Sequence, residues 1–304
     1  MIFKELETDQ DWSEAIALRN IYNWTHPGSI AEARSFHART KKDRIDIRYA
    51  GRIDNEIVFY GSVMLNKNAG DGTYWLTLSF DPKTDRSHDI FTEGVQEAEK
   101  RIREFGGKRS MYESRGEYTW EKGILEQNGF TLDMKFPYSC LEVDGCPCDL
   151  HPSVLSFAEY LKLNPDDGLH KIWRLEMDIA ADLPLPFPFV ETPFETYSNF
   201  ILDPEVDLEC KFLVFEDGEL KGMTQLWPSQ INPKLASTGL TGVRRPYRRQ
   251  GVATRAKRHS TAWAKQQGIE KIFTDNEENN PMYQLNLQLG FRHMFDYEVY
   301  SKPC

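Results

Sequence analysis

Hydrophobic and polar positions follow a similar order in the two halves of the chain. In the second half, an alternation with a period of two predicts strands at 170–179, 209–217, 219–228, 236–243, 271–275 and 291–300. Asp217 and Gly218 stand between two of these segments and predict a hairpin turn. Apolar or small residues recur at helical spacing in 252–267, and that helix is expected to end at Gly268. A shorter helix is predicted from Pro281 to Gly290.

The first half gives the same order of elements, with a hairpin expected around Asp54 and Asn55 and a long helix ending at Gly106. Three pairs of glycines lie at a nearly constant separation of 161 or 162 residues, each in a matching context: Gly61 and Gly222, Gly106 and Gly268, and Gly129 and Gly290. The repeat predicts a duplicated α/β fold. The turn-rich segment 144–149 then divides the chain into domains at 1–145 and 150–304.

Composition restricts the classes of partner. The 304 residues suffice for two domains, and their formal net charge of -10 disfavours nucleic acid. No apolar run reaches the roughly 18 residues of a membrane span. The first residues are acidic where a signal peptide would be basic and then apolar, so a cytoplasmic location is expected. The sequence does not fix the oligomeric state, and a homodimer is compatible with it.

The five cysteines show no disulfide framework, because their number is odd and their spacing irregular. Cys146 and Cys148 are the one close pair, with only His151 nearby, which is too few ligands for a zinc site. We expect two reduced thiols in a linker, and no metal.

One dense basic segment departs from the acidic balance. Seven arginines and lysines lie between Arg244 and Arg258 with no acid among them. They surround a predicted turn from strand to helix, where the pattern is Arg248-x-x-Gly251-x-Ala253. Free backbone N–H groups at a helix start attract phosphates, and glycine allows close approach. The segment therefore predicts a diphosphate site, with a solvated cationic surface as the alternative.

This segment resembles the cofactor loop of the GNAT superfamily of N-acetyltransferases, which reads Gln/Arg-x-x-Gly-x-Gly/Ala after the fourth strand. Asn279 to Met282, Asn286, and Leu289 to Phe291 resemble the second motif of that family. The likeness extends to tandem GNAT proteins of the mycothiol synthase type. It is specific in the last 65 residues or so and only topological in the first 145. It implies two tandem GNAT-like domains, each a mixed, mostly antiparallel twisted sheet flanked by helices.

The resemblance also implies acetyl-CoA as acetyl donor and assigns roles to residues. Val243 would polarise the thioester carbonyl through its N–H group, and Asn286 stands where many members have a tyrosine that protonates the leaving thiolate. Tyr283, one turn earlier, could replace that tyrosine or could simply pack on the sheet. The positions implied to contact the cofactor are Thr241, Gly242, Val243, Arg248, Arg249, Gln250, Gly251, Val252, Ala253, Thr254, Asn279 and Asn286.

The sequence does not identify the general base, because the strand predicted at 236–243 carries no carboxylate. Glu191, Glu195 and a water chain are candidates. Tyr297 and Tyr300 on the last strand are weaker candidates for the acid. An asparagine at 286 can equally serve as a helix cap or a packing residue.

The first half departs from the family pattern at the equivalent loop. After Pro82 it has no glycine pair, and Asp85 and Asp89 would repel phosphates. The first domain is therefore expected to lack the cofactor motif. The resemblance implies an acetyl-CoA-dependent N-acetyltransferase that acts by direct attack of a primary amine, which we expect to belong to a small acceptor. The alternative is a non-catalytic acyl-CoA-binding or regulatory protein.

Overall fold

A computed structural model describes residues 1–41, 46–66, 69–204 and 206–304. The chain forms two compact units. Unit 1 consists of Met1–Pro137, Pro186–Pro188 and Phe295–Cys304, and unit 2 consists of Tyr138–Leu185 and Phe189–Met294. Unit 1 is discontinuous in sequence because the last strand of the chain returns to it, and the short segment Pro186–Pro188, which belongs to unit 1, interrupts unit 2.

Unit 1 is a mixed sheet with helices on it. Its strands, in spatial order, are β1 (Ile2–Glu5), β2 (Asp46–Ile53), β3 (Glu56–Leu65), β4 (Thr73–Phe80), β5 (Arg109–Arg115) and β12 (Arg292–Pro303). All neighbours pair antiparallel except β4 and β5. The helices are α1 (Asp9–Tyr22), α2 (Ile30–Lys41), α3 (Ser87–Glu104) and α4 (Thr119–Gln127). As predicted, Asp54 and Asn55 turn the β2–β3 hairpin, both with positive φ.

Unit 2 repeats this plan. Its strands, in spatial order, are β6 (Thr131–Glu142), β11 (Lys271–Asp275), β10 (Leu235–Val243), β9 (Glu219–Pro228), β8 (Lys211–Glu216) and β7 (Val154–Ser156). Only β10 and β11 pair parallel. The helices are α5 (Phe157–Leu163), α6 (Gly168–Ala180), α7 (Phe194–Ile201), the 3-10 turn η1 (Arg245–Tyr247), α8 (Val252–Gln266) and α9 (Pro281–Gln288).

The last strand of each half completes the sheet of the other unit. Tyr138 to Glu142 of β6 pair with β11 in unit 2, and Tyr297 to Pro303 of β12 pair with β5 in unit 1. The two halves of the sequence, meeting between residues 145 and 150, therefore exchange strands.

The predicted repeat is visible in the elements. Gly61 and Gly222 lie in β3 and β9, and Gly106 and Gly268 follow the ends of α3 and α8. Gly129 and Gly290 follow α4 and α9. The duplicated α/β fold, with two mixed and mostly antiparallel sheets flanked by helices, is confirmed.

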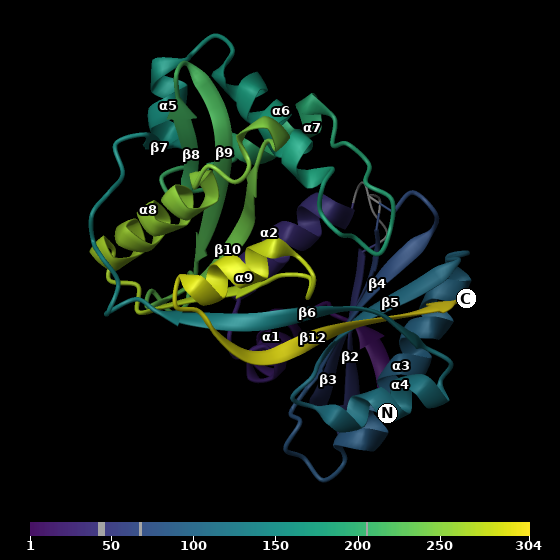
Figure 1. The fold of residues 1–304 in the computed structure, drawn as a ribbon. Coiled ribbons are helices and arrows are strands. Elements are labelled where there is room, and N and C mark those ends of the chain that lie inside the picture. Colours follow the sequence, from purple (N-terminus) through teal and green to yellow (C-terminus); the bar gives the residue numbers. More distant parts are fainter. Residues whose placement is uncertain (42–45, 67–68, 205) are drawn as a thin grey trace. The chain divides into compact units, whose positions relative to one another are not determined.

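Helices cover both faces of the sheet in unit 2 (Figure 1). Val252, Ala256 and Ala264 of α8 pack on one face, against residues such as Phe212 and Leu226. On the other face α6 and α7 pack against a second cluster, with α6 contributing Ile172, Leu175 and Ile179, and α7 contributing Tyr197 and Ile201. The backbone approach is closest at Gly242 of β10, where an added Cβ would lie 2.1 Å from Ile179 Cγ2.

The strand predicted at 170–179 is wrong, because these residues form most of α6. Leu175, Met177 and Ile179 are buried and alternate, which imitates a strand. Ile172, Leu175 and Ile179 are also three and four residues apart, and this spacing forms one face of a helix. Packing of that face against the sheet decides the outcome.

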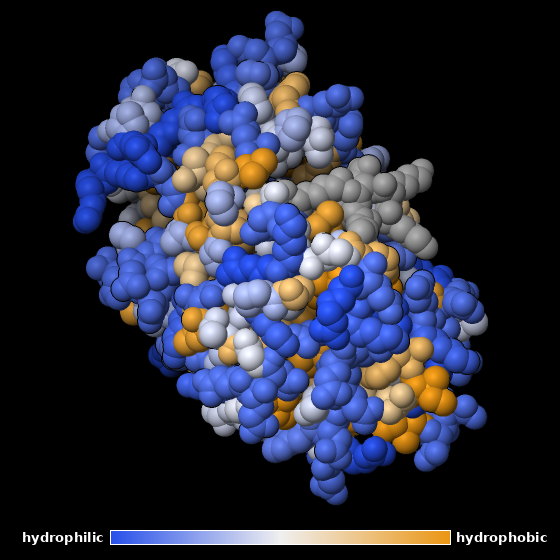
Figure 2. All heavy atoms as spheres, turned by 90° about the vertical axis from the view of Figure 1, so that its right-hand side faces the viewer, coloured by the Kyte–Doolittle hydropathy of each residue, from blue (hydrophilic) through white to orange (hydrophobic). Residues whose placement is uncertain are grey.

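Hydrophilic residues cover most of the face shown in Figure 2, and apolar residues form separate small patches on it. No helix in the described part of the chain is long and apolar enough to cross a membrane.

Candidate functional site

The turn between β10 and α8 presents a row of unbonded backbone donors. Arg249 and Gly251 have positive φ angles of 62° and 75°, which fold the backbone back just before the helix. Arg255 N–H, bonded to Gly251 O at 3.0 Å, is the first main-chain donor of the helix to find an acceptor. None of the six N–H groups from residue 249 to residue 254 has an acceptor in the described chain. Such a row at a helix N-terminus fits an anion with several oxygens.

The predicted loop residues line this turn. Val252 is buried in the core beneath it, whereas Ala253 and Thr254 are partly exposed in the first helical turn. The Gln250 side chain donates to Pro246 O at 3.1 Å and closes the turn from outside. Gly251 is required by its left-handed conformation, in addition to any need for close approach.

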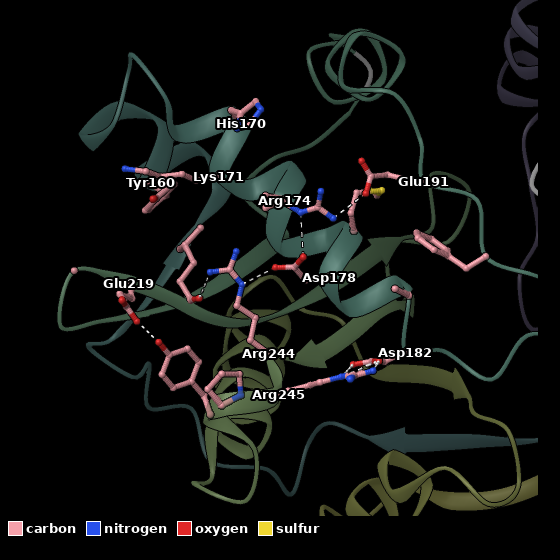
Figure 3. Close-up of a pocket in the computed structure, with 17 residues that line it drawn as sticks. Tyr160, His170, Lys171, Arg174, Asp178, Asp182, Glu191, Glu219, Arg244 and Arg245 are labelled. Atoms are coloured by element: carbon pink, nitrogen blue, oxygen red, sulfur yellow. Dashed lines mark hydrogen bonds and ion pairs between the residues drawn. The ribbon is translucent and has the colours of Figure 1, made fainter.

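Carboxylates of α6 and its C-terminal loop hold the basic side chains next to this turn (Figure 3). Arg244 contacts Asp178 at 3.1 Å, and Arg245 and Arg248 both contact Asp182. Arg248 also donates from Nε to Val243 O at 3.0 Å. Arg249, by contrast, is exposed and forms no ion pair with any described residue. A diphosphate at this turn would therefore meet one unpaired guanidinium, that of Arg249, and three that are already paired with carboxylates.

A cavity of about 780 Å³ lies beside these ion pairs, within unit 2. Arg174, which bridges Asp178 and Glu191, forms part of its wall together with Arg244 and Arg245 (Figure 3). The wall carries charges of both signs, and they pair with each other. Glu191, a candidate base by sequence, is thus engaged by Arg174 at 2.8 Å.

β10 leaves its parallel neighbour after a short contact. It pairs with β11 only from Leu235 to Ser237, and its pairing with β9 is irregular between Thr238 and Thr241. Arg244 N–H bonds Lys221 O on β9 at 3.0 Å. Because successive N–H groups of a strand point to opposite edges, the N–H of Val243 points away from β9. It is therefore directed to the edge that β11 no longer covers.

The other two predicted strand residues have structural contacts as well. The hydroxyl groups of Thr241 and Thr224 hydrogen-bond each other at 2.7 Å, which ties β10 to β9. Gly242 lies under α6 at Ile179, so α6 is held directly over the end of β10.

Asn286 has no exposed surface, and the oxygen of its side-chain amide has no partner among the described residues. Its nitrogen donates to Asn276 Oδ1, in the segment that follows β11. A buried amide oxygen without a donor is costly, so this position suits a ligand N–H group or a water. Asn280, not Asn286, caps α9 through a bond from Met282 N–H at 2.9 Å.

The remaining predicted residues of this region lie on α9 or just before it. Asn279 is exposed, and Glu277 holds both its main-chain and side-chain nitrogens. Tyr283 is half-buried, and no described residue bonds to its hydroxyl. Tyr300 donates to Glu298, and Tyr297 accepts from Arg115, both on the part of β12 that belongs to unit 1.

Sequence analysis missed a polar cluster on the α6 face of the sheet. Glu176 Oε2 accepts from Tyr197 Oη on α7 at 2.9 Å and from Gln225 Nε2 on β9 at 3.3 Å. Burial raises the pKa of Glu176, while the bond from Tyr197 and the charge of Lys211 oppose that rise. Because residues 170–179 were predicted to form a strand, the position of the Glu176 carboxylate on a helix over the sheet was not recognised. The glutamate within an otherwise apolar helix face was the available signal.

Lys211 of β8 is part of the same cluster. The residue is 0% exposed and its Nζ has no hydrogen-bond partner among the described residues. Nζ lies 3.2 Å from the ring centroid of Trp227, a close cation–π contact. Burial lowers the pKa of Lys211.

The equivalent region of unit 1 is filled by aromatic side chains. Phe80, which lies 161 residues before Thr241, is 0% exposed. Its ring is 5.4 Å from that of Tyr22 and 5.9 Å from those of Phe91 and Trp120. The helix that follows, α3, has an acid in its first turn, Asp89, and no side-chain cap. This arrangement does not offer the cationic turn found in unit 2.

No group of three or more histidine, cysteine, aspartate or glutamate residues in the described chain could hold a metal ion.

Comparisons with known proteins show a family match in unit 2. The model of the acetyltransferase (GNAT) family matches residues 171–291. Residues 171–291 form a GNAT acetyltransferase domain. This match contains the turn between β10 and α8, together with α8 and α9, so the GNAT motifs read from the sequence lie in the matched part of unit 2. A search among curated proteins found no match.

Solved GNAT structures share the whole fold. A GCN5-related N-acetyltransferase from Sphaerobacter thermophilus has a TM-score of 0.72 at 15% identity, covering 99% of this chain and 95% of its own. A tandem GNAT protein from the clavulanic acid biosynthesis pathway has a TM-score of 0.70 at 15% identity, covering 99% and 98%. A GNAT-family acetyltransferase from Colwellia psychrerythraea has a TM-score of 0.62 at 16% identity, covering both chains completely. The tandem GNAT fold is thus confirmed, and family and fold support acetyl transfer as the kind of reaction.

Proposed function

We propose that this protein is an acetyl-CoA-dependent N-acetyltransferase that transfers the acetyl group to a primary amine of a small acceptor. The observation that carries the proposal is the row of six unbonded N–H groups from residue 249 to residue 254. A diphosphate needs several donors at one place, and a helix start with an adjacent free guanidinium, Arg249, supplies them. Acetyl-CoA contains such a diphosphate and is the donor that the GNAT family generally uses.

The other predicted contact residues are assigned here to successive parts of acetyl-CoA, from its diphosphate to its thioester. Arg248, Gln250, Gly251, Val252, Ala253 and Thr254 form or support the diphosphate turn, and Thr241 and Gly242 border the arm on β10. The outward N–H of Val243 would polarise the thioester carbonyl. The unpartnered oxygen of Asn286 suits an amide N–H of the arm, with Asn279 nearer the surface. Tyr283 is the hydroxyl on α9 that could protonate the leaving thiolate.

We assign the donor site to the domain 150–304 alone. The domain 1–145 is a degenerate GNAT-like domain in this proposal, because aromatic side chains fill its equivalent of the arm site. The five cysteines are free thiols, which agrees with a reducing, cytoplasmic location.

Titration calorimetry with acetyl-CoA tests the proposal. We expect binding of one acetyl-CoA per chain, and release of free CoA when a panel of small primary amines is added. No heat with acetyl-CoA would reject the donor site. Two acetyl-CoA molecules per chain would reject the assignment of unit 1 as degenerate.

The second candidate is a protein that binds acyl-CoA without turnover. Its support is Asn286, whose amide cannot protonate a thiolate at the position where relatives of this type carry tyrosine. Tight binding of acetyl-CoA together with no CoA release from any amine would favour it.

A further inference from the structure

We propose that Glu176 receives the ammonium group of the acceptor and takes its proton before attack on the thioester. The inference rests on the proposed function and adds the acceptor side of the site, with an amine that is protonated at neutral pH as the class of substrate. It is drawn from the polar cluster between α6, α7 and the sheet.

The hydrogen bonds of Glu176 leave one side of its carboxylate open. Both donors, Tyr197 Oη and Gln225 Nε2, bond to Oε2. Oε1 has no partner in the described chain, and the residue is half-buried, so solvent or a ligand can reach it. A carboxylate held in this way has a fixed orientation and a free oxygen for an ammonium group.

The cluster also reaches the strand that carries the proposed oxyanion donor. A Cβ placed on Gly239 would lie 3.0 Å from Gln225 Oε1 and 2.2 Å from Trp227 Nε1. Gly239 falls within the irregular stretch of β10, four residues before Val243. A chain of contacts therefore connects Glu176 through Gln225 to the part of β10 where the thioester is expected. Glu191 and Glu195 lack such a path, because Glu191 pairs with Arg174 and Glu195 is exposed.

Neighbouring groups set the charge of Glu176. Tyr197 of α7 and Lys211 of β8 both favour its ionised form, against the effect of burial. Gln225 is the residue of β9 that faces it, and β10 carries no titratable side chain. Tyr160 of α5 interacts with Lys171 and Asp167 instead. Burial raises the pKa of Glu176 and these partners limit the rise. Opposing effects of this kind adjust the pKa of carboxylates that transfer protons.

The chemical step balances with groups already named. The ammonium proton passes to Glu176, and the freed amine nitrogen forms a bond with the acyl carbon. The carbon–sulfur bond breaks with its electron pair going to sulfur, and the thiolate takes a proton from Tyr283 or from water. The acylated nitrogen then releases its second proton, which restores that donor, and Glu176 passes the first proton to solvent. The products are an N-acetyl amine and free CoA.

The test compares acceptors that differ only in whether they need a base. Wild-type protein and Glu176→Gln are assayed for CoA release with benzylamine, putrescine and lysine, which are protonated at neutral pH, and with methoxyamine, which is not. We expect kcat/KM of Glu176→Gln to fall by about 100-fold or more with the first three amines. Turnover with methoxyamine and the affinity for acetyl-CoA should not change. Glu104→Gln, the same substitution at an exposed position of α3 in unit 1, is the control and should behave as wild type.

The pH profile separates a base from a structural role. Removing a group that favours the ionised form of Glu176 raises the pKa of Glu176. Tyr197→Phe and Lys211→Met should therefore each move the acidic limb of the plot of kcat/KM against pH to higher pH. Glu176→Gln should lose that limb.

Three results would overturn the proposal. They are an unchanged benzylamine rate in Glu176→Gln, an equal loss with benzylamine and methoxyamine, and a wild-type protein that binds acetyl-CoA but acetylates none of these amines. Absence of acetyl-CoA binding by the wild type would instead remove the proposed function itself.

Discussion

Asp182 and Arg245 form an ion pair in which Arg245 Nε lies 3.1 and 3.2 Å from the two carboxylate oxygens of Asp182. Arg248 contacts the same carboxylate. These hydrogen bonds, that from Arg245 first, lower the pKa of Asp182 to about 2, so it is ionised at neutral pH. The carboxylate of Asp182 thus binds two arginines beside the turn, and a phosphate group of the donor would have to compete with it for them.

Replacing Asp182 with asparagine should strengthen acetyl-CoA binding. The substitution removes the competing charge and frees two guanidinium groups for phosphate oxygens. Because exposed ion pairs are weak, we expect an increase in affinity of about fivefold at most at low salt, measured by calorimetry. Asp217→Asn, which affects an exposed carboxylate that pairs with Lys221 in the turn of the β8–β9 hairpin and not with an arginine of the β10–α8 turn, should leave affinity unchanged. A loss of affinity in Asp182→Asn would show that Asp182 orders the arginines and does not compete for them.

The two ends of α8 offer a matched pair of glycines. Gly251 and Gly268 have nearly the same backbone angle, with φ of 75° and 77°. Alanine at either position should destabilise the protein by about 1–2 kcal/mol, because both require the left-handed conformation. Only Gly251→Ala should also weaken acetyl-CoA binding, by about tenfold or more, as expected from a lost hydrogen bond to a charged group. Equal affinities in the two variants, at equal losses of stability, would argue against a diphosphate at this turn.

Glu121 in unit 1 should make stability depend on pH. Its carboxylate is fully buried, and that burial raises its pKa to about 7, against bonds from Ser114, Tyr22 and Tyr112. A raised pKa means that the folded protein favours the protonated form. The contribution of Glu121 to stability is therefore present at low pH and lost as pH rises through about 7.

The variant Glu121→Gln cannot titrate and should show this effect by difference. Between about pH 5 and pH 8 its free energy of unfolding should rise by up to about 3 kcal/mol relative to that of wild type. Urea unfolding at both pH values measures the change. Glu126→Gln, at an exposed position on the same helix, is the control. Parallel curves for wild type and Glu121→Gln would contradict a raised pKa.

Gly242 should tolerate no side chain while Ile179 is present. Because the new Cβ would lie 2.1 Å from Ile179 Cγ2, Gly242→Ala should cost roughly 1–3 kcal/mol of stability. In an Ile179→Ala background the added methyl group enters the space left by the isoleucine, so the cost should nearly disappear. A double-mutant cycle by chemical denaturation gives the coupling energy. Additive effects would mean that α6 is not held against β10 at this point.

The local sequence was sufficient to predict those turns and helix ends that depend on particular residues such as glycine and proline. The Asp217–Gly218 hairpin, the turn before Val252 and the helix from Pro281 all appear as predicted, because glycine, proline and charge act within a few residues. Glu176 was not found, because Leu175, Met177 and Ile179 fit either a strand or a helix until packing selects one. The partner of Arg245 lies 63 residues away along the chain, and nothing local indicates it. The exchange of β6 and β12 was hidden for a related reason, since an alternating strand fits any sheet with a free edge.

The exchange of last strands has a consequence for the origin of the chain. A single-unit ancestor, corresponding to one half of the present gene, would have had a final strand that did not complete its own sheet. Two such molecules could have satisfied each other reciprocally, as a domain-swapped homodimer does. Fusion of two copies would then have joined an existing pair, in which each member already depended on the other for one strand of its sheet.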